Sequence, residues 1–254
     1  MAGRLDGTVA LVTGASSGIG EATALALAAE GAAVAVAARR KDRLEALAQK
    51  IEGDGGRAFV RETDVTDEGS AAAAVDATVE ELGRLDVVIN NAGLMLLGPI
   101  VGADTAEWTR MVELNVLGLM YVTAAALPHL LRAAEDGPRE VSDLVNVSSV
   151  AGRVARSGSG AYNATKWAVN AFSEALRQEV TERHLRVTLV EPGAVSTELA
   201  GHNRPEVLSS LRSSLGDIQR MEADDIADAI TYVVTRPRHV ALNEVLIRPT
   251  QQVR

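Results

Sequence analysis

The chain has 254 residues, of which 47% are hydrophobic and 23% charged, a composition typical of a globular protein with one large α/β domain or two small ones. Its net charge of −9 leaves no basic excess to neutralise phosphates, which argues against binding to nucleic acid or to an anionic membrane surface. Cysteine is absent, so disulfides, thiolate catalysis and Cys-ligated metals are excluded, and the four histidines have no metal-ligand spacing, so we expect no metal site.

Residues 1–14 lack the long apolar stretch of a signal peptide. The longest uncharged segment, 115–131, is slightly short for a membrane span and is broken by Gly118 and Pro128. We interpret this segment as a buried or interface helix. The expected location is the cytoplasm, with no membrane partner.

Short apolar segments alternate with helical ones along the chain. Strands are predicted at 8–13, 32–38, 57–62, 86–90, 143–149, 185–193 and 243–249. Helices are predicted at 21–30, 42–51, 67–82, from 104 toward 131, at about 160–181 and at 223–235, and Asp104 with Glu107 has capping-box spacing. This alternation indicates a single α/β domain, 1–254, with a doubly wound parallel sheet and helices on both faces.

Two segments fall outside this pattern. Residues 132–143 are polar and contain Gly and Pro, which predicts a loop. Residues 196–220 are weakly patterned, and a long segment of this kind inside a compact domain is typical of a lid over a binding site.

The segment TGASSGIG, 13–20, follows the first predicted strand and opens the first helix, with glycines at 14, 18 and 20. Glycines in this position allow a tight turn and bring backbone amides close to a pyrophosphate. A purely structural turn is the alternative, and a P-loop is excluded because no Gly-Lys-Ser/Thr follows. The position at the first strand-to-helix turn favours dinucleotide binding.

The end of the second predicted strand meets the adenosine ribose in such a site. Ala38 stands where NAD-binding proteins carry an acid, and Arg39 and Arg40 follow it. A solvated helix N-terminus would explain them too, but basic residues there oppose the helix dipole. We therefore expect the 2′-phosphate of NADP(H), with Arg39 as the main determinant and Arg40 as the second.

A set of motifs resembles the short-chain dehydrogenase/reductase family over nearly the whole chain. They are TGASSGIG (13–20), NNAG (90–93), Asn115 in LNVLG, NVSS (146–149), YNATK (162–166) and EPGAVST (191–197), with Ser149 preceding Tyr162 by 13 residues as in the family pattern. The resemblance implies a Rossmann fold with a seven-stranded sheet. It also implies a homotetramer or homodimer, for which we expect pairing through 115–131 and 160–181.

The resemblance extends to individual site residues. For cofactor binding it implies Gly14, Ser16, Ser17, Gly18, Ile19, Gly20, Arg39, Arg40, Asp64, Val65, Asn91, Ala92, Gly93, Tyr162, Lys166, Pro192, Gly193, Val195 and Thr197. For catalysis it implies Asn115, Ser149, Tyr162 and Lys166. Ser149 would donate a hydrogen bond to a carbonyl oxygen where negative charge develops, and Asn115 would hold a water in the proton relay.

Tyr162 and Lys166 are four residues apart and would share a helix face. Most such pairs lie on solvated faces, but the accompanying motifs favour a chemical role. A free tyrosine has a pKa near 10, and moving it toward 7 takes about 4 kcal/mol, roughly what one ammonium at about 4 Å supplies in a partly shielded site. We expect Lys166 to make Tyr162 acidic enough to transfer a proton.

The predicted activity is NADPH-dependent reduction of an aldehyde or ketone to an alcohol. Segments such as 95–99, 126–132, 172–183 and 247–253 resemble family members that reduce the clavulanate aldehyde, and members that oxidise serine or other 3-hydroxy acids are a more distant match. A non-catalytic nucleotide-binding regulator and an epimerase or dehydratase are further alternatives. The joint presence of Ser149, Tyr162 and Lys166 favours the enzyme.

Overall fold

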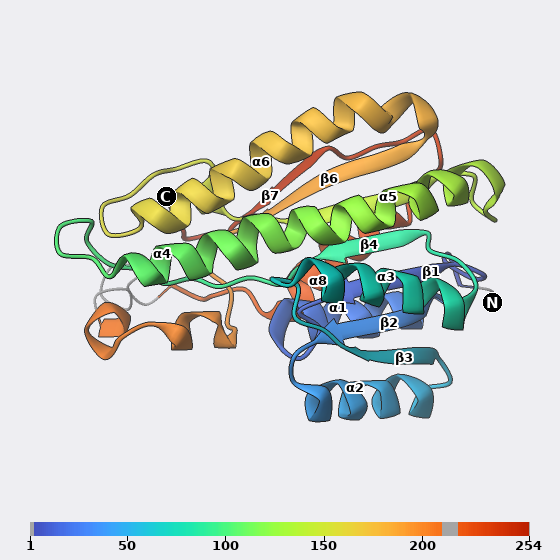
Figure 1. Cartoon of the computed structure of the whole chain (residues 1–254), viewed down its shortest axis with the longest axis horizontal. Helices are drawn as coiled ribbons and strands as arrows, with labels where there is room; N and C mark the ends of the chain where they lie inside the picture. The colour runs from blue at the N-terminus through green and yellow to red at the C-terminus, as the bar shows by residue number, and fades with distance from the viewer. Residues whose placement is uncertain (1–2, 210–217, 254) are drawn as a thin grey trace.

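The computed structural model describes residues 3–209 and 218–253, and within them the strands form one parallel sheet (Figure 1). The strand order is β3-β2-β1-β4-β5-β6-β7, which confirms the predicted seven-stranded doubly wound fold. The strands are β1 Val9–Thr13, β2 Ala33–Ala38, β3 Arg57–Glu62, β4 Val87–Asn90, β5 Ser142–Val147, β6 Leu185–Pro192 and β7 Glu244–Ile247.

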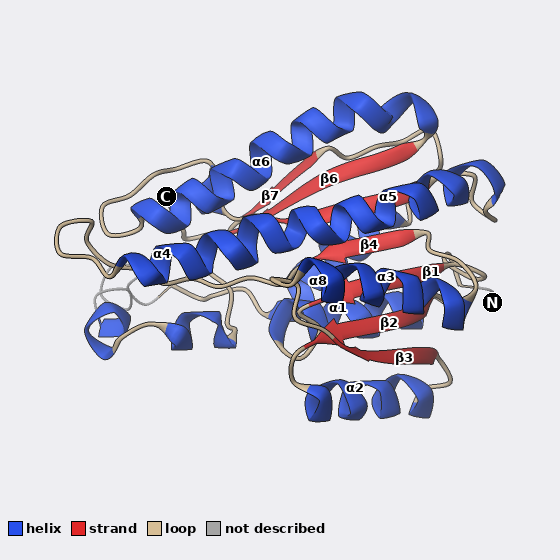
Figure 2. Cartoon of the chain, viewed as in Figure 1, coloured by secondary structure: helices blue, strands red, loops and turns tan. Residues whose placement is uncertain are grey.

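Helices cover both faces of the sheet (Figure 2). One layer consists of α1 Gly18–Ala29, α2 Lys41–Gly53 and α8 Ala223–Val234. The other consists of α3 Glu68–Leu82, α5 Leu119–Asp136, which continues α4 Thr105–Val112, and α6 Gly160–Val180. Short helical turns lie at η1 Glu113–Gly118, η2 Val150–Gly152, η3 Thr181–Arg183 and η4 Glu198–His202.

Each face of the sheet has its own hydrophobic core. On β1, Ala10 and Val12 belong to the core beneath α1, α2 and α8, whereas Leu11 between them belongs to the core beneath α3, α5 and α6. All three side chains are fully buried. A strand covered on both sides must be apolar at every position, which explains why the strand segments show no polar–apolar alternation.

The uncharged segment at 115–131 lies in the layer formed by α3, α5 and α6. By length and composition the helical stretch 105–136 is long and apolar enough to cross a membrane. Here α5 contacts β4 and β5, with Val122, Ala126 and Leu130 buried in the core. This side of α5 therefore serves as a sheet-covering face.

The predicted loop at 132–143 is wrong at both ends. Helix α5 continues to Asp136 because Ala133 and Ala134 are buried in the domain, and β5 already begins at Ser142. Asp143 is fully buried, and its carboxylate accepts hydrogen bonds from Arg186 at 2.7 and 2.9 Å. Composition alone predicts a loop wherever polar residues gather, and it does not show that a charged residue such as Asp143 is buried in an ion pair.

Two further boundaries differ from the prediction. The strand expected at 143–149 ends at Val147, and Ser149 instead caps η2, with its side chain accepting a hydrogen bond from Ala151 N at 3.1 Å. The helix expected from 104 toward 131 contains the π-helical turn η1 between α4 and α5. In place of the proposed capping box, the structure shows a simple N-cap, in which Asp104 Oδ1 accepts from Ala106 N at 3.0 Å.

The strand order reverses direction between β1 and β4, so the loops after these strands diverge to opposite sides. Ligands of doubly wound folds bind in the crevice that this divergence opens at the carboxyl ends of the strands. The glycine turn follows β1, the 90–93 motif overlaps the end of β4, Ser149 follows β5 and Pro192 ends β6. The fold thus brings the separate sequence motifs to one edge of the sheet.

Candidate active site

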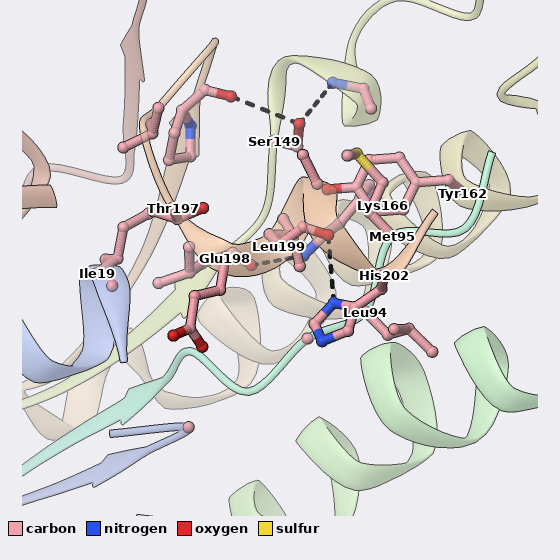
Figure 3. A pocket seen from close by; sticks show the side chains of 18 of the residues that line it. Ile19, Leu94, Met95, Ser149, Tyr162, Lys166, Thr197, Glu198, Leu199 and His202 are labelled. Atoms are coloured by element: carbon pink, nitrogen blue, oxygen red, sulfur yellow. Dashed lines mark hydrogen bonds between the residues drawn. The ribbon is translucent and has the colours of Figure 1, made fainter. Parts of the chain in front are cut away.

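A cavity of about 810 Å³ lies over the carboxyl ends of the strands (Figure 3). Its size is within the range of sites for small molecules and cofactors. Of the residues predicted from the sequence, Gly20 and Asn115 are not among the described residues that line it, and all the others are.

The glycine turn is held against the loop that follows β4. Gly14 has a φ of +65°, and a Cβ there would lie 2.7 Å from Ala92 Cα, so a side chain would be both strained and crowded. Gly20 lies beneath the cavity and leaves room for the side chain of Asn91. A Cβ at position 20 would come within 2.5 Å of Asn91 Nδ2. That amide donates to Thr13 O at 3.0 Å and to Gly14 O at 3.2 Å. These contacts shape a cradle at the N-terminus of α1, where backbone amides favour anions.

The two arginines after β2 differ in their surroundings. Arg39 lines the cavity, is exposed, and makes no side-chain hydrogen bond or ion pair within residues 3–209 and 218–253. Arg40 folds across the glycine turn, where Nε donates to Ser16 Oγ at 3.1 Å and Nη2 to Ser17 Oγ at 2.7 Å. The cradle, the basic pair and the absence of an acid at Ala38 fit a dinucleotide that carries a 2′-phosphate.

Ser149, Tyr162 and Lys166 converge on the cavity (Figure 3). Tyr162 and Lys166 lie on one buried face of α6, each 6% exposed, and the Tyr162 hydroxyl forms a hydrogen bond with Ser149. Lys166 Nζ lies 5.9 Å from the centre of the Tyr162 ring and donates to Val147 O at 2.8 Å. The structure therefore brings the three residues together but directs the ammonium to the backbone.

Burial dominates the protonation of this pair. It raises the pKa of the Tyr162 phenol to about 12, and the hydrogen bond with Ser149 lowers that pKa only in part. Burial also lowers the pKa of the Lys166 ammonium to about 8. Lys166 alone does not lower the Tyr162 pKa as the sequence led us to expect, because desolvation of the phenol outweighs its other interactions.

Asn115 lies beneath the cavity in the π-helical turn η1 and is 2% exposed. Its Oδ1 accepts from Leu94 N at 2.7 Å, and its Nδ2 donates to Leu94 O at 2.8 Å and to Thr165 Oγ1 at 3.2 Å. The carboxamide thus ties the segment after β4 to α6, one residue before Lys166. The proposed water-holding role of Asn115 stays a prediction.

The sequence did not predict an ion pair of the buried Glu191 beside the Ser149 loop. Glu191 is fully buried and accepts from Arg153 Nε at 2.7 Å, from Arg153 Nη2 at 2.8 Å and from Asn170 Nδ2 at 2.7 Å. Arg153 follows η2, and Glu191 is the penultimate residue of β6, so the pair joins the Ser149 loop to the end of β6. The signal was the single carboxylate of a strand that is buried along its whole length, because a buried carboxylate requires a partner.

The described part of the predicted lid borders the cavity through η4. Leu199, His202 and Val207 line the cavity, and residues 210–217 of the expected lid lie outside the described residues. Asn203 fixes η4 to the segment after β4, since its Oδ1 accepts from Leu97 N at 2.7 Å and its Nδ2 donates to Met95 O at 2.9 Å.

Other lining residues were not predicted either, and Gln252 of the C-terminal segment is one of them. The side chain of Gln252 accepts from Ala194 N at 2.8 Å, beside Gly193. This segment follows the last strand, where the sequence shows no periodic pattern that would place it at the site.

Comparison with known proteins gives a consistent result. The short chain dehydrogenase family matches residues 8–207. Glycine betaine reductase of Emericella nidulans is 40% identical over 98% of this chain, which spans only 19% of that protein's length, and an uncharacterized oxidoreductase of Staphylococcus saprophyticus is 37% identical over 96% of both. The closed form of a serine dehydrogenase complexed with NADP⁺ superposes with a TM-score of 0.88 at 28% identity, covering 97% of each chain. The chain belongs to the short-chain dehydrogenase family and has the oxidoreductase fold of its relatives.

Proposed function

We propose that the protein is an NADPH-dependent reductase that converts an aldehyde or ketone into an alcohol. The observation that carries this proposal is the convergence of Ser149, Tyr162 and Lys166 on a cavity that also contains the glycine cradle and two arginines. The NADP⁺ complex of the similar serine dehydrogenase supports the choice of cofactor.

The groups that would hold NADP(H) are the glycine turn and the side chains of Arg39 and Lys166. The amides of the glycine turn at the N-terminus of α1 would bind the pyrophosphate, and Arg39 would bind the 2′-phosphate. Lys166 would bind the ribose next to the reacting ring, as the family resemblance implies. The bound cofactor supplies the hydride that the carbonyl carbon accepts.

Ser149, Tyr162 and Lys166 would act on the carbonyl oxygen of the substrate. Ser149 Oγ would donate a hydrogen bond to the carbonyl oxygen, and the Tyr162 hydroxyl would deliver the proton as negative charge develops there. Because its pKa is raised to about 12 by burial, the phenol holds its proton at neutral pH, which suits a proton donor in reduction. The Lys166 ammonium on the same face would stabilise the phenolate left behind.

For the substrate we propose the clavulanate aldehyde or a related carbonyl compound of secondary metabolism, on the strength of the sequence resemblance at 95–99 and 247–253. The substrate end of the cavity is lined by apolar side chains such as Met95, Leu97 and Leu199, together with His202. Oxidation of serine or another 3-hydroxy acid is the second candidate, and the similarity to serine dehydrogenase favours it.

A substrate panel tests this proposal. Aldehydes, ketones and 3-hydroxy acids are offered to the protein with NADPH or NADP⁺, and turnover is followed by NADPH absorbance. A reductase consumes one NADPH for each alcohol formed, whereas an epimerase or dehydratase shows no net consumption. Tight NADPH binding without turnover across the panel would instead support a nucleotide-binding regulator.

We also propose a cytoplasmic homodimer or homotetramer. Apolar side chains on the helices at 105–131 and 160–181 remain exposed, namely Val112 at 44%, Leu117 at 37% and Trp167 at 51%. Such surface is a typical feature of subunit interfaces.

A further inference from the structure

A carboxylate of the lid lies at the phosphate end of the cavity. Glu198, the first residue of η4, accepts a hydrogen bond from Arg40 Nη1 at 2.9 Å, and its other oxygen lies 3.7 Å from Arg43 Nη1. The side chain of Ser17, which precedes α1, also contributes a hydrogen bond. In Figure 3 Glu198 lies near Ile19 and Thr197, on the side of the cavity away from Tyr162.

The carboxylate is charged in this position. Its hydrogen bond with Arg40 holds the Glu198 pKa below the usual value; burial opposes this shift, and the charge of Arg40 and the contacts with Ser17 and Arg43 add to it. The groups around it are the hydroxyl of Ser17 and the guanidinium groups of Arg40 and Arg43, and hydroxyl and guanidinium groups also bind phosphates. Glu198 therefore places an internal anion beside the cradle that the cofactor phosphates would use.

Arg40 connects this anion to the ribose end of the site. One guanidinium donates to Ser16 Oγ, to Ser17 Oγ and to Glu198, so it spans from the end of β2 to the lid. The side chains of Arg40 and Glu198 are 43% and 49% exposed. An ion pair this exposed contributes little stability and is readily exchanged for another anion.

We propose that Glu198 competes with the 2′-phosphate of the cofactor for Arg40 and thereby lowers the affinity for NADPH more than the affinity for NADH. The proposal rests on NADP(H) as the cofactor. Arg39 has no such competitor among the described residues, so it remains the main determinant, whereas the availability of Arg40 depends on Glu198. A carboxylate and a phosphate dianion that approach one guanidinium repel each other, and NADH brings no anion to this position.

The test is the binding of both nucleotides to Glu198→Gln, measured by fluorescence titration of the full-length protein. The substitution keeps the side-chain volume and removes the charge. We expect NADPH to bind roughly twofold to fivefold more tightly, the range that a contact between exposed charges spans, and NADH affinity to change by less than about 1.5-fold. The gain should shrink at high salt because screening weakens contacts between exposed charges.

Glu206→Gln is the matched control. Glu206 is an exposed glutamate of the same segment that makes no ion pair within the described residues. The substitution Glu206→Gln also removes one negative charge, but at a position that has no contact with Arg40, so it should leave the affinities for NADPH and NADH unchanged. In an Arg40→Gln background, Glu198→Gln should no longer tighten NADPH binding, because the contested group is gone.

Several results would overturn the inference. Weaker binding of both nucleotides to Glu198→Gln would mean that Glu198 closes over the bound cofactor. Equal tightening of both would mean competition with the shared pyrophosphate. A full gain in the Arg40→Gln background would mean that Arg40 is not involved. Wild-type protein that binds neither nucleotide would overturn the proposed cofactor as well, whereas NADPH binding with no response to Glu198→Gln overturns this inference alone.

Discussion

Lys166 Nζ lies 5.9 Å from the centre of the Tyr162 ring and gives its hydrogen bond to Val147 O, although the two side chains share one buried face of α6. Proximity on a helix therefore does not by itself make the phenol acidic. Both groups are desolvated, so the neutral form of each is favoured. The chemistry of the pair depends on what else enters the cavity.

Replacing the phenol should separate catalysis from binding. In Tyr162→Phe we expect turnover to fall by about 10²- to 10⁴-fold, the usual contribution of a positioned proton donor, while NADPH affinity changes little. The ring keeps its place in the buried cluster with Leu94 and Met111. Steady-state rates and fluorescence titration of the same preparation give both numbers. Wild-type activity in Tyr162→Phe would show that the YNATK segment has only a structural role in its helix.

Removing the buried ammonium should stabilise the fold. Lys166→Met eliminates the desolvated charge but leaves Val147 O without its donor, and we expect a net gain of about 1–2 kcal/mol in the free energy of unfolding at about pH 7. Urea unfolding measures it, with the exposed Lys50→Met as control. A loss of stability in Lys166→Met would contradict the burial penalty.

The pH dependence of that gain has a defined sign. The pKa of Lys166 is about 8 in the folded chain and 10.5 in the reference state, so between these values the unfolded chain binds more protons. Wild-type stability from this group therefore rises with pH across the window, and it is lowest below about 8. The advantage of Lys166→Met should shrink toward about pH 10, and a constant advantage would exclude titration of Lys166 as its cause.

The same lysine should affect both binding and rate. In Lys166→Ala we expect weaker NADPH binding, because the proposed ribose contact is lost. We also expect the pH–rate profile to move toward higher pH, since the phenolate loses a stabilising charge. Rates measured from about pH 6 to 10 and a parallel titration test this. An unshifted profile with intact binding would assign Lys166 a structural role.

Cofactor preference should follow Arg39, which has no side-chain partner among residues 3–209 and 218–253. Arg39→Asp should abolish or invert the preference for NADPH over NADH, because it removes the charge available to the 2′-phosphate and places an acid one residue after Ala38. The ratio of kcat/KM for the two cofactors is the measurement. If the ratio stays at its wild-type value, Arg39 does not bind the 2′-phosphate.

The exposed tryptophan of α6 should report on assembly. Trp167 is 51% exposed although it is large and apolar. If α6 pairs with a second subunit, Trp167→Glu should dissociate the assembly by burying an unpaired charge. Sedimentation velocity at micromolar concentration distinguishes the states, with Glu179→Gln on the exposed side of α6 as control. A wild-type monomer would end the interface proposal.

The sequence predicted the sheet and the motif residues of the cavity lining because both depend on local patterns. Apolar strands followed by helices define the parallel order, and motif residues such as Gly14, Asn91 and Ser149 come directly after strands, where the fold places its site. Contacts between distant polar residues were not predictable. Arg40 and Glu198 are 158 residues apart, and nothing local to either residue indicates the other.

Burial explains the remaining differences. Asp143 and Glu191 are charged residues inside strands, which single-residue propensities disfavour, and each is accepted only because an arginine from another segment reaches it. Burial also explains why the pKa of Tyr162 is raised and not lowered as the sequence predicted. The sequence shows which groups are neighbours along a helix but not how much water they lose.

The ion pair between Arg153 and Glu191 limits how this site can change through mutation or by design. Arg153 also pairs with Glu244 of β7, so one guanidinium joins the Ser149 loop to two strands. Exchanging the Ser149 loop for that of another family member leaves the buried Glu191 without its Arg153 partner unless that arginine is transferred too. The Ser149 loop and the end of β6 are therefore constrained to change together, and a loop graft between relatives has to carry both members of the pair.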